Sequence, residues 1–267
     1  MEGIADLLKD VPIIYLGAAA SLVAGAATGL GALPVLFTRN ISGKAQDVML
    51  GFGAGVMLAA TSFSLIVPGI ETAIEDTGSA PLSALIVTFG ILLGGVFLWA
   101  SDKYSPHEHF ITGPEGSDPR NIKRLWLFII AITLHNFPEG LAVGVGFGGG
   151  DIPGGVALAT GIGLQNIPEG LVVALALLRE KYPLRDALVI PLLTGLVEPV
   201  GGVMGAGVVT VARPLLPLGL AFAAGAMLFV ISDEIIPESH RKGFEKEATA
   251  GVMVGFVVMM FLDVTLG

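Results

Sequence analysis

The sequence predicts an all-α membrane protein with eight transmembrane helices. Of its 267 residues, 53% are hydrophobic and only 14% are charged, whereas a soluble domain carries about 25% charged residues. The mean hydropathy is +0.81, and the 38 glycines are typical of membrane helices that pack closely. The chain has no cysteine, which excludes disulfides, thiolate metal ligands and a cysteine nucleophile.

Eight apolar runs are long enough to cross a bilayer, which takes about 20 helical residues. In chain order, these spans one to eight cover residues 11–37, 46–70, 80–100, 122–148, 153–178, 184–212, 215–238 and 245–266. The segment before span one lacks the basic start of a signal peptide. We therefore expect a single transmembrane domain over residues 1–267.

The loops between the spans differ strongly in basic charge. Loops on one side hold 12 of the 14 Lys and Arg residues, and the other side holds only Lys9 and Arg213. Basic loops face the cytoplasm, so both termini are expected outside. The segment Glu71–Asp76 is expected to be an acidic outer loop, either merely solvated or serving as a cation-attracting vestibule.

The fourth and fifth spans carry matching motifs thirty residues apart. Span four contains His135-Asn136-Phe137-Pro138-Glu139-Gly140, and span five contains Gln165-Asn166-Ile167-Pro168-Glu169-Gly170. In each motif the first residue and the Glu are four apart, so both side chains share a helix face. The Pro also removes one helical hydrogen bond and frees a carbonyl. This combination of imidazole, amides and carboxylates predicts a cation site within the membrane.

Three spans flank the two motif spans on each side. Because each flanking repeat would have an odd number of spans, the repeats would be inverted, which is a common plan in transporters. We therefore expect a 3+2+3 arrangement.

A third intramembrane acid, Glu198, precedes Pro199 in span six. A carboxylate at the bilayer centre costs about 2.5–3.5 kcal/mol, and the spans offer no Lys or Arg to pair with Glu139, Glu169 and Glu198. A bound divalent cation, or protonation in its absence, would compensate the charge. The structural alternative is that these acids bond to Ser, Thr or Asn as packing residues.

These motifs resemble the ZIP family of divalent-metal transporters (Zrt/Irt-like proteins). The resemblance extends over nearly the whole chain, to Glu198, to the segment Asp233–His240 and to His residues between spans three and four. The compact loops are similar to those of prokaryotic members.

The resemblance implies a binuclear metal site between spans two, four, five and six. One position would be formed by Met57, His135, Gln165, Glu139 and Glu169. The second would use Asn136, Asn166 and Glu198, with the same two glutamates bridging. Many members have His or Asp where this chain has Gln165 and Asn166, so the second ion is expected to bind more weakly or to be regulatory. Spans one, four, five and six would move against a scaffold of the other four.

Met57 and Ser64 gain interest only through this resemblance. Met57 alone would be a core filler, and Ser64 alone would bond back to its own helix. A relay at the entrance or exit would use Glu71, Ser64, Asp233, Glu234, Glu238, His240, His107 and His109. For the residues of span seven, a charge cluster at a helix end is an equal alternative.

The expected function is transport of Zn²⁺ or Cd²⁺, with Fe²⁺ or Mn²⁺ as further cargo, into the cytoplasm through the plasma (inner) membrane. Up to two ions would bind, with the lipid bilayer as surroundings and without an organic cofactor or nucleic acid. An ion channel with the same site is the first alternative. An intramembrane metallohydrolase would need H-E-x-x-H, but Asn136 follows His135, so no enzyme is expected. A homodimer could form where spans three and eight carry Gly90/Gly94 and Gly251/Gly255.

Overall fold

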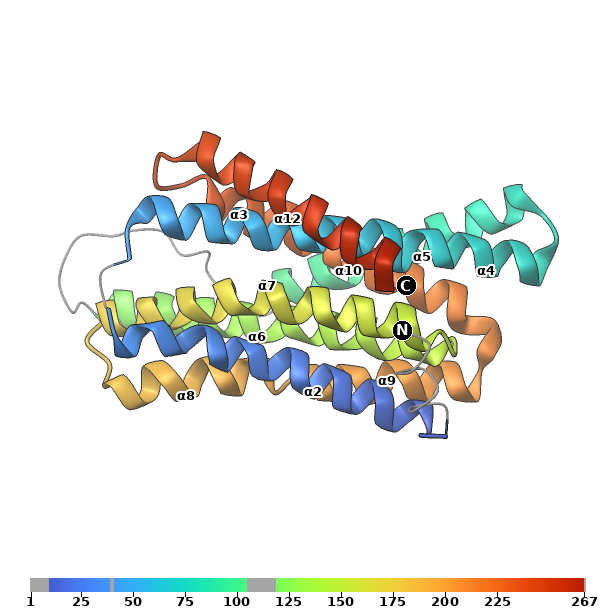
Figure 1. Cartoon of the computed structure of the whole chain (residues 1–267), viewed down its shortest axis with the longest axis horizontal. Coiled ribbons are helices and arrows are strands. Elements are labelled where there is room, and N and C mark those ends of the chain that lie inside the picture. Colours follow the sequence, from blue (N-terminus) through green and yellow to red (C-terminus); the bar gives the residue numbers. More distant parts are fainter. Residues whose placement is uncertain (1–9, 39–40, 105–118, 267) are drawn as a thin grey trace.

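A computed structural model describes residues 10–38, 41–104 and 119–266, and these residues form helices without strands (Figure 1). In chain order the elements are α2 (Ile13–Ala32), η1 (Leu33–Leu36), α3 (Gly43–Ala59), η2 (Ala60–Ile66), α4 (Val67–Thr77), α5 (Ala80–Tyr104), α6 (Pro119–Gly148), α7 (Ile152–Arg179), α8 (Leu184–Gly195), α9 (Glu198–Val211), η3 (Arg213–Leu215), α10 (Leu216–Val230), η4 (Ile231–Ile235), α11 (Ile236–Ser239) and α12 (Glu245–Leu266).

The predicted all-α membrane fold is confirmed. Within the described residues, seven helical segments are long and apolar enough to cross a membrane, namely Ile13–Leu36, Gly43–Thr77, Ala80–Ala100, Ile152–Leu178, Leu184–Val211, Arg213–Ser239 and Glu245–Leu266. Helix α6, which carries the predicted fourth span, is 30 residues long and packs against α2, α7 and α9 inside the bundle. The start of α2 and the end of α12 lie at the same end of the bundle (Figure 1), as an even number of spans requires.

In three spans, the regular α-helix is interrupted shortly before a proline. Spans two and seven pass through the π-helical segments η2 and η4, which precede Pro68 and Pro237. Span six ends its first helix at Gly195 and starts α9 at Glu198, with Pro199 in the first turn. Proline is tolerated there because the first helical N–H groups have no partner within the helix. The break places Glu198 at a helix N-terminus, which stabilises a carboxylate by about 0.3–1 kcal/mol.

The helices form two packed groups (Figure 1). Helix α3 lies along α12 and α5 lies along α10, forming one group with η2, α4, η4 and α11. Helices α2, α6, α7, α8 and α9 pack extensively on one another and form the second group. The groups meet mainly where α7 contacts α3 and where α6 contacts α10. This division follows the two sets of spans that the family resemblance implies.

Matched contacts relate the two flanking repeats. A Cβ on Gly255 of α12 would overlap the carbonyl oxygen of Phe52 in α3, and a Cβ on Gly94 of α5 would overlap that of Phe222 in α10. In the reverse direction, a Cβ on Gly55 of α3 would overlap the carbonyl oxygen of Val252 in α12, and a Cβ on Gly225 of α10 would overlap that of Ile91 in α5. Spans two and eight therefore pack as spans seven and three do, which fits the expected inverted repeats.

Two expectations are wrong in detail. The segment Glu71–Asp76 is not a loop, because α4 continues to Thr77 and ends only at Gly78, whose φ of 65° favours glycine. The glycines of spans three and eight do not face outward. Gly90 and Gly94 lie against α10, and Gly251 and Gly255 lie against α3, so they pack the monomer and give no support to a homodimer.

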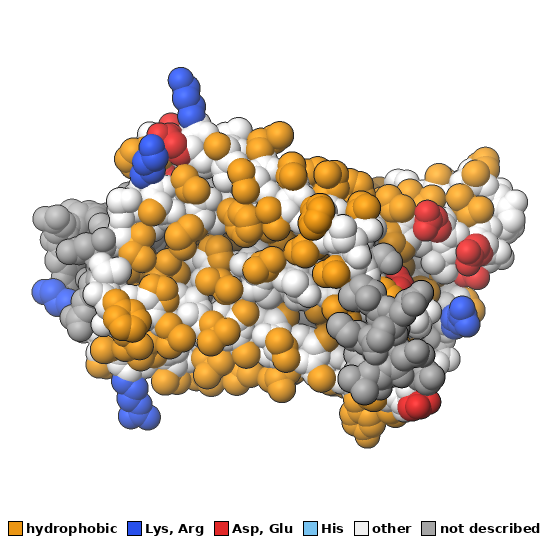
Figure 2. All heavy atoms as spheres, viewed as in Figure 1, with side chains coloured by type: hydrophobic (Ala, Val, Ile, Leu, Met, Phe, Trp, Pro, Cys, Tyr) orange, Lys and Arg blue, Asp and Glu red, His pale blue; other side chains and the backbone are white. Residues whose placement is uncertain are grey.

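Charged side chains are distributed unevenly over the surface of the bundle. In the face shown in Figure 2, hydrophobic side chains cover the middle of the bundle, and most of the acidic side chains in view gather at the end near α4. Large hydrophobic side chains on α5 and α12, such as Leu85, Phe89 and Phe261, are exposed, as expected of helices that face lipid.

Candidate metal site

The two motifs place their polar side chains in the interior of the bundle. Asn136 and Glu139 come from α6, and Gln165, Asn166 and Glu169 come from α7. None of these five residues is more than 5% exposed. Because each motif keeps its helix intact through its proline, the motif side chains retain the common face that their spacing predicts.

Glu198 joins this interior from the start of α9 and is fully buried. The backbone of His135 lies in α6, but its side chain is outside the described residues, as are His107 and His109. Six of the eight predicted ligands are therefore buried together in α6, α7 and α9.

A chain of short hydrogen bonds links two acids through two amides. Gln165 Nε2 donates to Glu139 Oε1 at 2.5 Å and to Asn166 Oδ1 at 2.8 Å. Asn166 Nδ2 donates in turn to Glu198 Oε1 at 2.6 Å and to the carbonyl oxygen of Ala24 in α2 at 2.8 Å. Bonds to ionised acceptors are about twice as strong as neutral ones. The chain thus joins α2, α6, α7 and α9 at one level of the bundle.

Two of the acids, Glu139 and Glu198, are linked through amides. Among the described residues, which do not include the His135 side chain, no group of three or more His, Asp or Glu side chains could hold a metal ion.

Met57 lies in the other helix group, next to this site. It is 1% exposed on α3. One turn earlier, a Cβ on Gly53 would lie 3.7 Å from Gln165 Cβ, so that α3 approaches α7 at the first residue of its motif. Met57 lies four residues after Gly53 and therefore shares its helix face.

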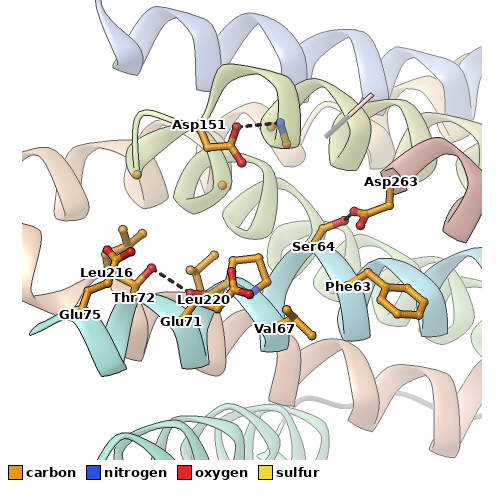
Figure 3. Close-up of a pocket in the computed structure, with 15 residues that line it drawn as sticks. Phe63, Ser64, Val67, Glu71, Thr72, Glu75, Asp151, Leu216, Leu220 and Asp263 are labelled. Carbon is orange, nitrogen blue, oxygen red and sulfur yellow. Dashed lines mark hydrogen bonds between the residues drawn. The ribbon is translucent and has the colours of Figure 1, made fainter. Parts of the chain in front are cut away.

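A cavity of about 400 Å³ with both polar and apolar lining residues lies beside η2 and α4 (Figure 3). Its lining includes the predicted entrance residues Ser64 and Glu71, together with the acids Glu75, Asp151 and Asp263. Ser64 does not bond back to its own helix as a lone serine would, because its Oγ donates to Asp263 Oδ1 in α12 at 2.5 Å. Ser62 does bond back, to the carbonyl oxygen of Leu58.

Sequence reasoning missed two acids. Asp263 stands alone among apolar residues late in span eight, a signal that could have identified it. Asp47 near the start of α3 is fully buried, with Lys242 Nζ 3.8 Å from its Oδ1. Asp47 lies one residue inside the predicted start of span two at residue 46.

Two of the predicted exit residues, Glu238 and His240, make contacts that are consistent with the alternative of a charge cluster at a helix end. Glu238 forms an ion pair with Arg241. His240 has both ring nitrogens engaged, Nδ1 with Ser239 and the carbonyl of Ile236 at 2.9 Å, and Nε2 with Thr249 at 3.2 Å. These contacts fix the end of α11 beside α12. Asp233 and Glu234 lie in the π-helical η4 one turn earlier.

Comparison with known proteins identifies the family of this chain. The family described as ZIP zinc transporter matches residues 107–263. The chain is 52% identical over 251 residues to "Zinc transporter GufA" of Myxococcus xanthus, covering 94% of this chain and 99% of that protein. It is 47% identical over 242 residues to "Zinc transporter ZIPB" of Bordetella bronchiseptica, covering 91% and 78%. It is 34% identical over 321 residues to "Zinc transporter ZIP11" of Homo sapiens, covering 90% and 94%. The chain therefore belongs to the ZIP zinc transporter family, a family of membrane transporters and not of enzymes.

Proposed function

We propose that this chain carries Zn²⁺ into the cytoplasm across the plasma (inner) membrane, with both termini outside, through a two-ion site between α3, α6, α7 and α9. The buried hydrogen-bond chain from Glu139 through Gln165 and Asn166 to Glu198 carries this proposal. His135, Glu169, Asn136 and Met57 complete the ligand set. Before cargo binds, the amides satisfy one oxygen of each linked acid, and an incoming Zn²⁺ replaces those bonds with stronger ones.

The division of the helices supports alternating access as the mechanism. Most of the ligands belong to the group of α2, α6, α7, α8 and α9, whereas Met57 belongs to the other group. Movement of the first group against the second carries the ions from the cavity at Ser64 and Glu71 toward Asp233 and Glu234. Mixed amide, carboxylate and thioether ligation lets the ions leave again, since transport needs binding that is not too tight.

Zn²⁺ uptake into proteoliposomes, measured over a range of ion concentrations, tests this proposal. A transporter is expected to saturate, because each cycle moves a bound ion, and a channel with the same site would show flux that keeps rising with concentration. Non-saturating flux would overturn alternating access in favour of the channel.

Met57 is expected to set the preference for soft ions. In the Met57→Ala variant, uptake of Cd²⁺ should fall about tenfold while uptake of Mn²⁺ changes less than twofold, since thioethers favour soft cations. Met253 is 61% exposed on α12 and provides a matched control, as Met253→Ala should leave both rates unchanged. Equal losses for Cd²⁺ and Mn²⁺ would mean that Met57 acts through packing alone.

The acidic cavity is expected to attract cations electrostatically. Glu71→Gln should raise the KM for Zn²⁺ about twofold to threefold at low ionic strength and leave the maximal rate unchanged. The difference should disappear near 1 M salt, where the Debye length is only about 3 Å. Glu180, at the opposite end of α7, supplies the control variant Glu180→Gln. A KM effect that persists in high salt would point to direct ligation instead.

A further inference from the structure

The helices that hold the site are themselves built from two matched halves. A Cβ on Gly25 of α2 would overlap the carbonyl oxygen of Gly195 in α8, and a Cβ on Gly195 would overlap that of Gly25. Gly31 in the same way lies against the carbonyl of Ile167, and Gly201 lies against that of Phe137. Ile167 and Phe137 are the third residues of the two motifs, so span one packs on span five as span six packs on span four.

This relation pairs Thr28 of span one with Glu198 of span six. Gly170, the last residue of the span-five motif, packs against the carbonyl of Thr28, and Gly140 packs against that of Glu198. The spacing agrees as well, because Thr28 follows Gly25 by three residues and Glu198 follows Gly195 by three.

The side chains of Thr28 and Glu198 each reach toward the glycine of the other span, in opposite directions. The Cδ of Glu198 lies 3.3 Å from the position of a Cβ on Gly25, and Thr28 Oγ1 lies 2.8 Å from the position of a Cβ on Gly195. Glu198 meets Asn166 from the span-five motif. If the relation extends to the side chains, Asn136 of the span-four motif is the residue that corresponds to Asn166 as the neighbour of the Thr28 hydroxyl.

Thr28 and Asn136, which correspond to Glu198 and Asn166, both have unsatisfied polar atoms. Thr28 and Asn136 are fully buried, and within the described residues Thr28 Oγ1 and both side-chain polar atoms of Asn136 have no hydrogen-bond partner. The matching atoms of the first pair are bonded at 2.6 Å. Buried polar atoms normally find partners, since each unsatisfied one destabilises the fold. A cation between Thr28 and Asn136 would be ligated by Thr28 Oγ1 and Asn136 Oδ1, and a water bound to that cation could accept a hydrogen bond from Asn136 Nδ2.

We propose that Thr28 is a further residue of the second metal position, where its hydroxyl, opposite Asn136, takes the place that Glu198 takes opposite Asn166. This inference rests on the proposed two-ion site. Because the same position also holds Glu198, Thr28 adds a neutral oxygen ligand to it on the side of Asn136.

The test compares Thr28→Val, which keeps the shape and removes the hydroxyl, with Thr28→Ser, which keeps the hydroxyl. Zn²⁺ uptake into proteoliposomes should show a KM about five to ten times higher for Thr28→Val, the effect of losing one buried polar partner. Thr28→Ser should retain the wild-type KM. Thr210→Val is the matched control on α9, because the Thr210 hydroxyl bonds only to Ala206 in its own helix.

Zn²⁺ stoichiometry on the purified protein provides a second readout. The number of Zn²⁺ ions bound per chain is measured by elemental analysis after equilibrium dialysis. At Zn²⁺ concentrations that fill both positions of the wild type, this number should fall from two toward one in Thr28→Val. Where Thr28→Val does not yield folded protein, Thr28→Ala serves for the same measurement.

Wild-type KM and stoichiometry in Thr28→Val would overturn the inference and leave a bridging water as the role of the site. An equal loss of transport in Thr28→Val and Thr28→Ser with unchanged KM would overturn it in favour of packing. Glu139→Ala, measured alongside, separates the two proposals. If it transports normally, the metal site itself is misassigned, and if it is inactive while Thr28→Val is normal, only the role of Thr28 is wrong.

Discussion

Glu139→Ala and Glu169→Ala are each expected to lower saturable Zn²⁺ uptake by roughly a hundredfold or more, equivalent to about 2.7 kcal/mol of lost binding. Each removes a charged ligand that the proposal assigns to both ion positions. Glu198→Ala should weaken only the second position and slow transport by about tenfold. Initial rates of ⁶⁵Zn²⁺ uptake in proteoliposomes, normalised to the amount of folded protein, provide the measurement.

The control for loss of a carboxylate is Glu247→Ala. Glu247 also belongs to a membrane helix and contacts a cation, Lys44 Nζ at 2.9 Å, but the pair is exposed at the end of α12. Exposed ion pairs contribute about 0–1 kcal/mol, so this variant should transport normally. Wild-type uptake by Glu139→Ala would show that Glu139 is not a ligand of the transported ion. If Glu139→Ala and Glu247→Ala lost uptake equally, the loss would reflect the removal of any carboxylate and not of a metal ligand.

Much of the fold follows from the sequence because the bilayer simplifies the physics. A span must satisfy all its backbone hydrogen bonds within itself, so run length and hydropathy alone locate the helices within a few residues. The end of span two was misjudged because α4 extends beyond the apolar run as a polar, amphipathic turn as far as Gly78. Hydropathy detects where the membrane ends, but not where a helix ends.

The site was predictable where polar residues stand in apolar runs. Glu139, Glu169 and Glu198 were found in this way, and Asp263 could have been. The partners within the site could not be read from sequence. Gln165 and Asn166 bridge Glu139 and Glu198 because α6, α7 and α9 meet there, and that meeting is determined by glycine contacts between distant segments. Thr28 gave no signal at all, since threonine is common in membrane helices and only the packing shows that its position in span one corresponds to that of Glu198 in span six.

The glycines of the motifs are expected to matter for folding as much as the acids matter for transport. In Gly170→Ala the new Cβ would overlap the carbonyl oxygen of Thr28, which is rigid helix backbone. Helices α2 and α7 would have to separate, and overpacking of this kind costs about 1–3 kcal/mol or more. Gly140→Ala meets the carbonyl of Glu198 in the same way and would also displace the start of α9, which holds that acid.

Gly207→Ala is the matched control, because a Cβ at Gly207 in α9 would meet nothing within 4 Å. Alanine also favours a helix by about 0.8–1 kcal/mol over glycine, so this variant should be as stable as the wild type or slightly more stable. The measurement is the temperature at which half of the detergent-solubilised protein is lost from the monodisperse peak in size-exclusion chromatography. Gly170→Ala should lose this peak several degrees below the wild type. Equal midpoints for Gly170→Ala and Gly207→Ala would show that α2 and α7 do not need this close approach. The motif glycine would then have to be explained by the conformation or access of the neighbouring Glu169, and no longer by the distance between the helices.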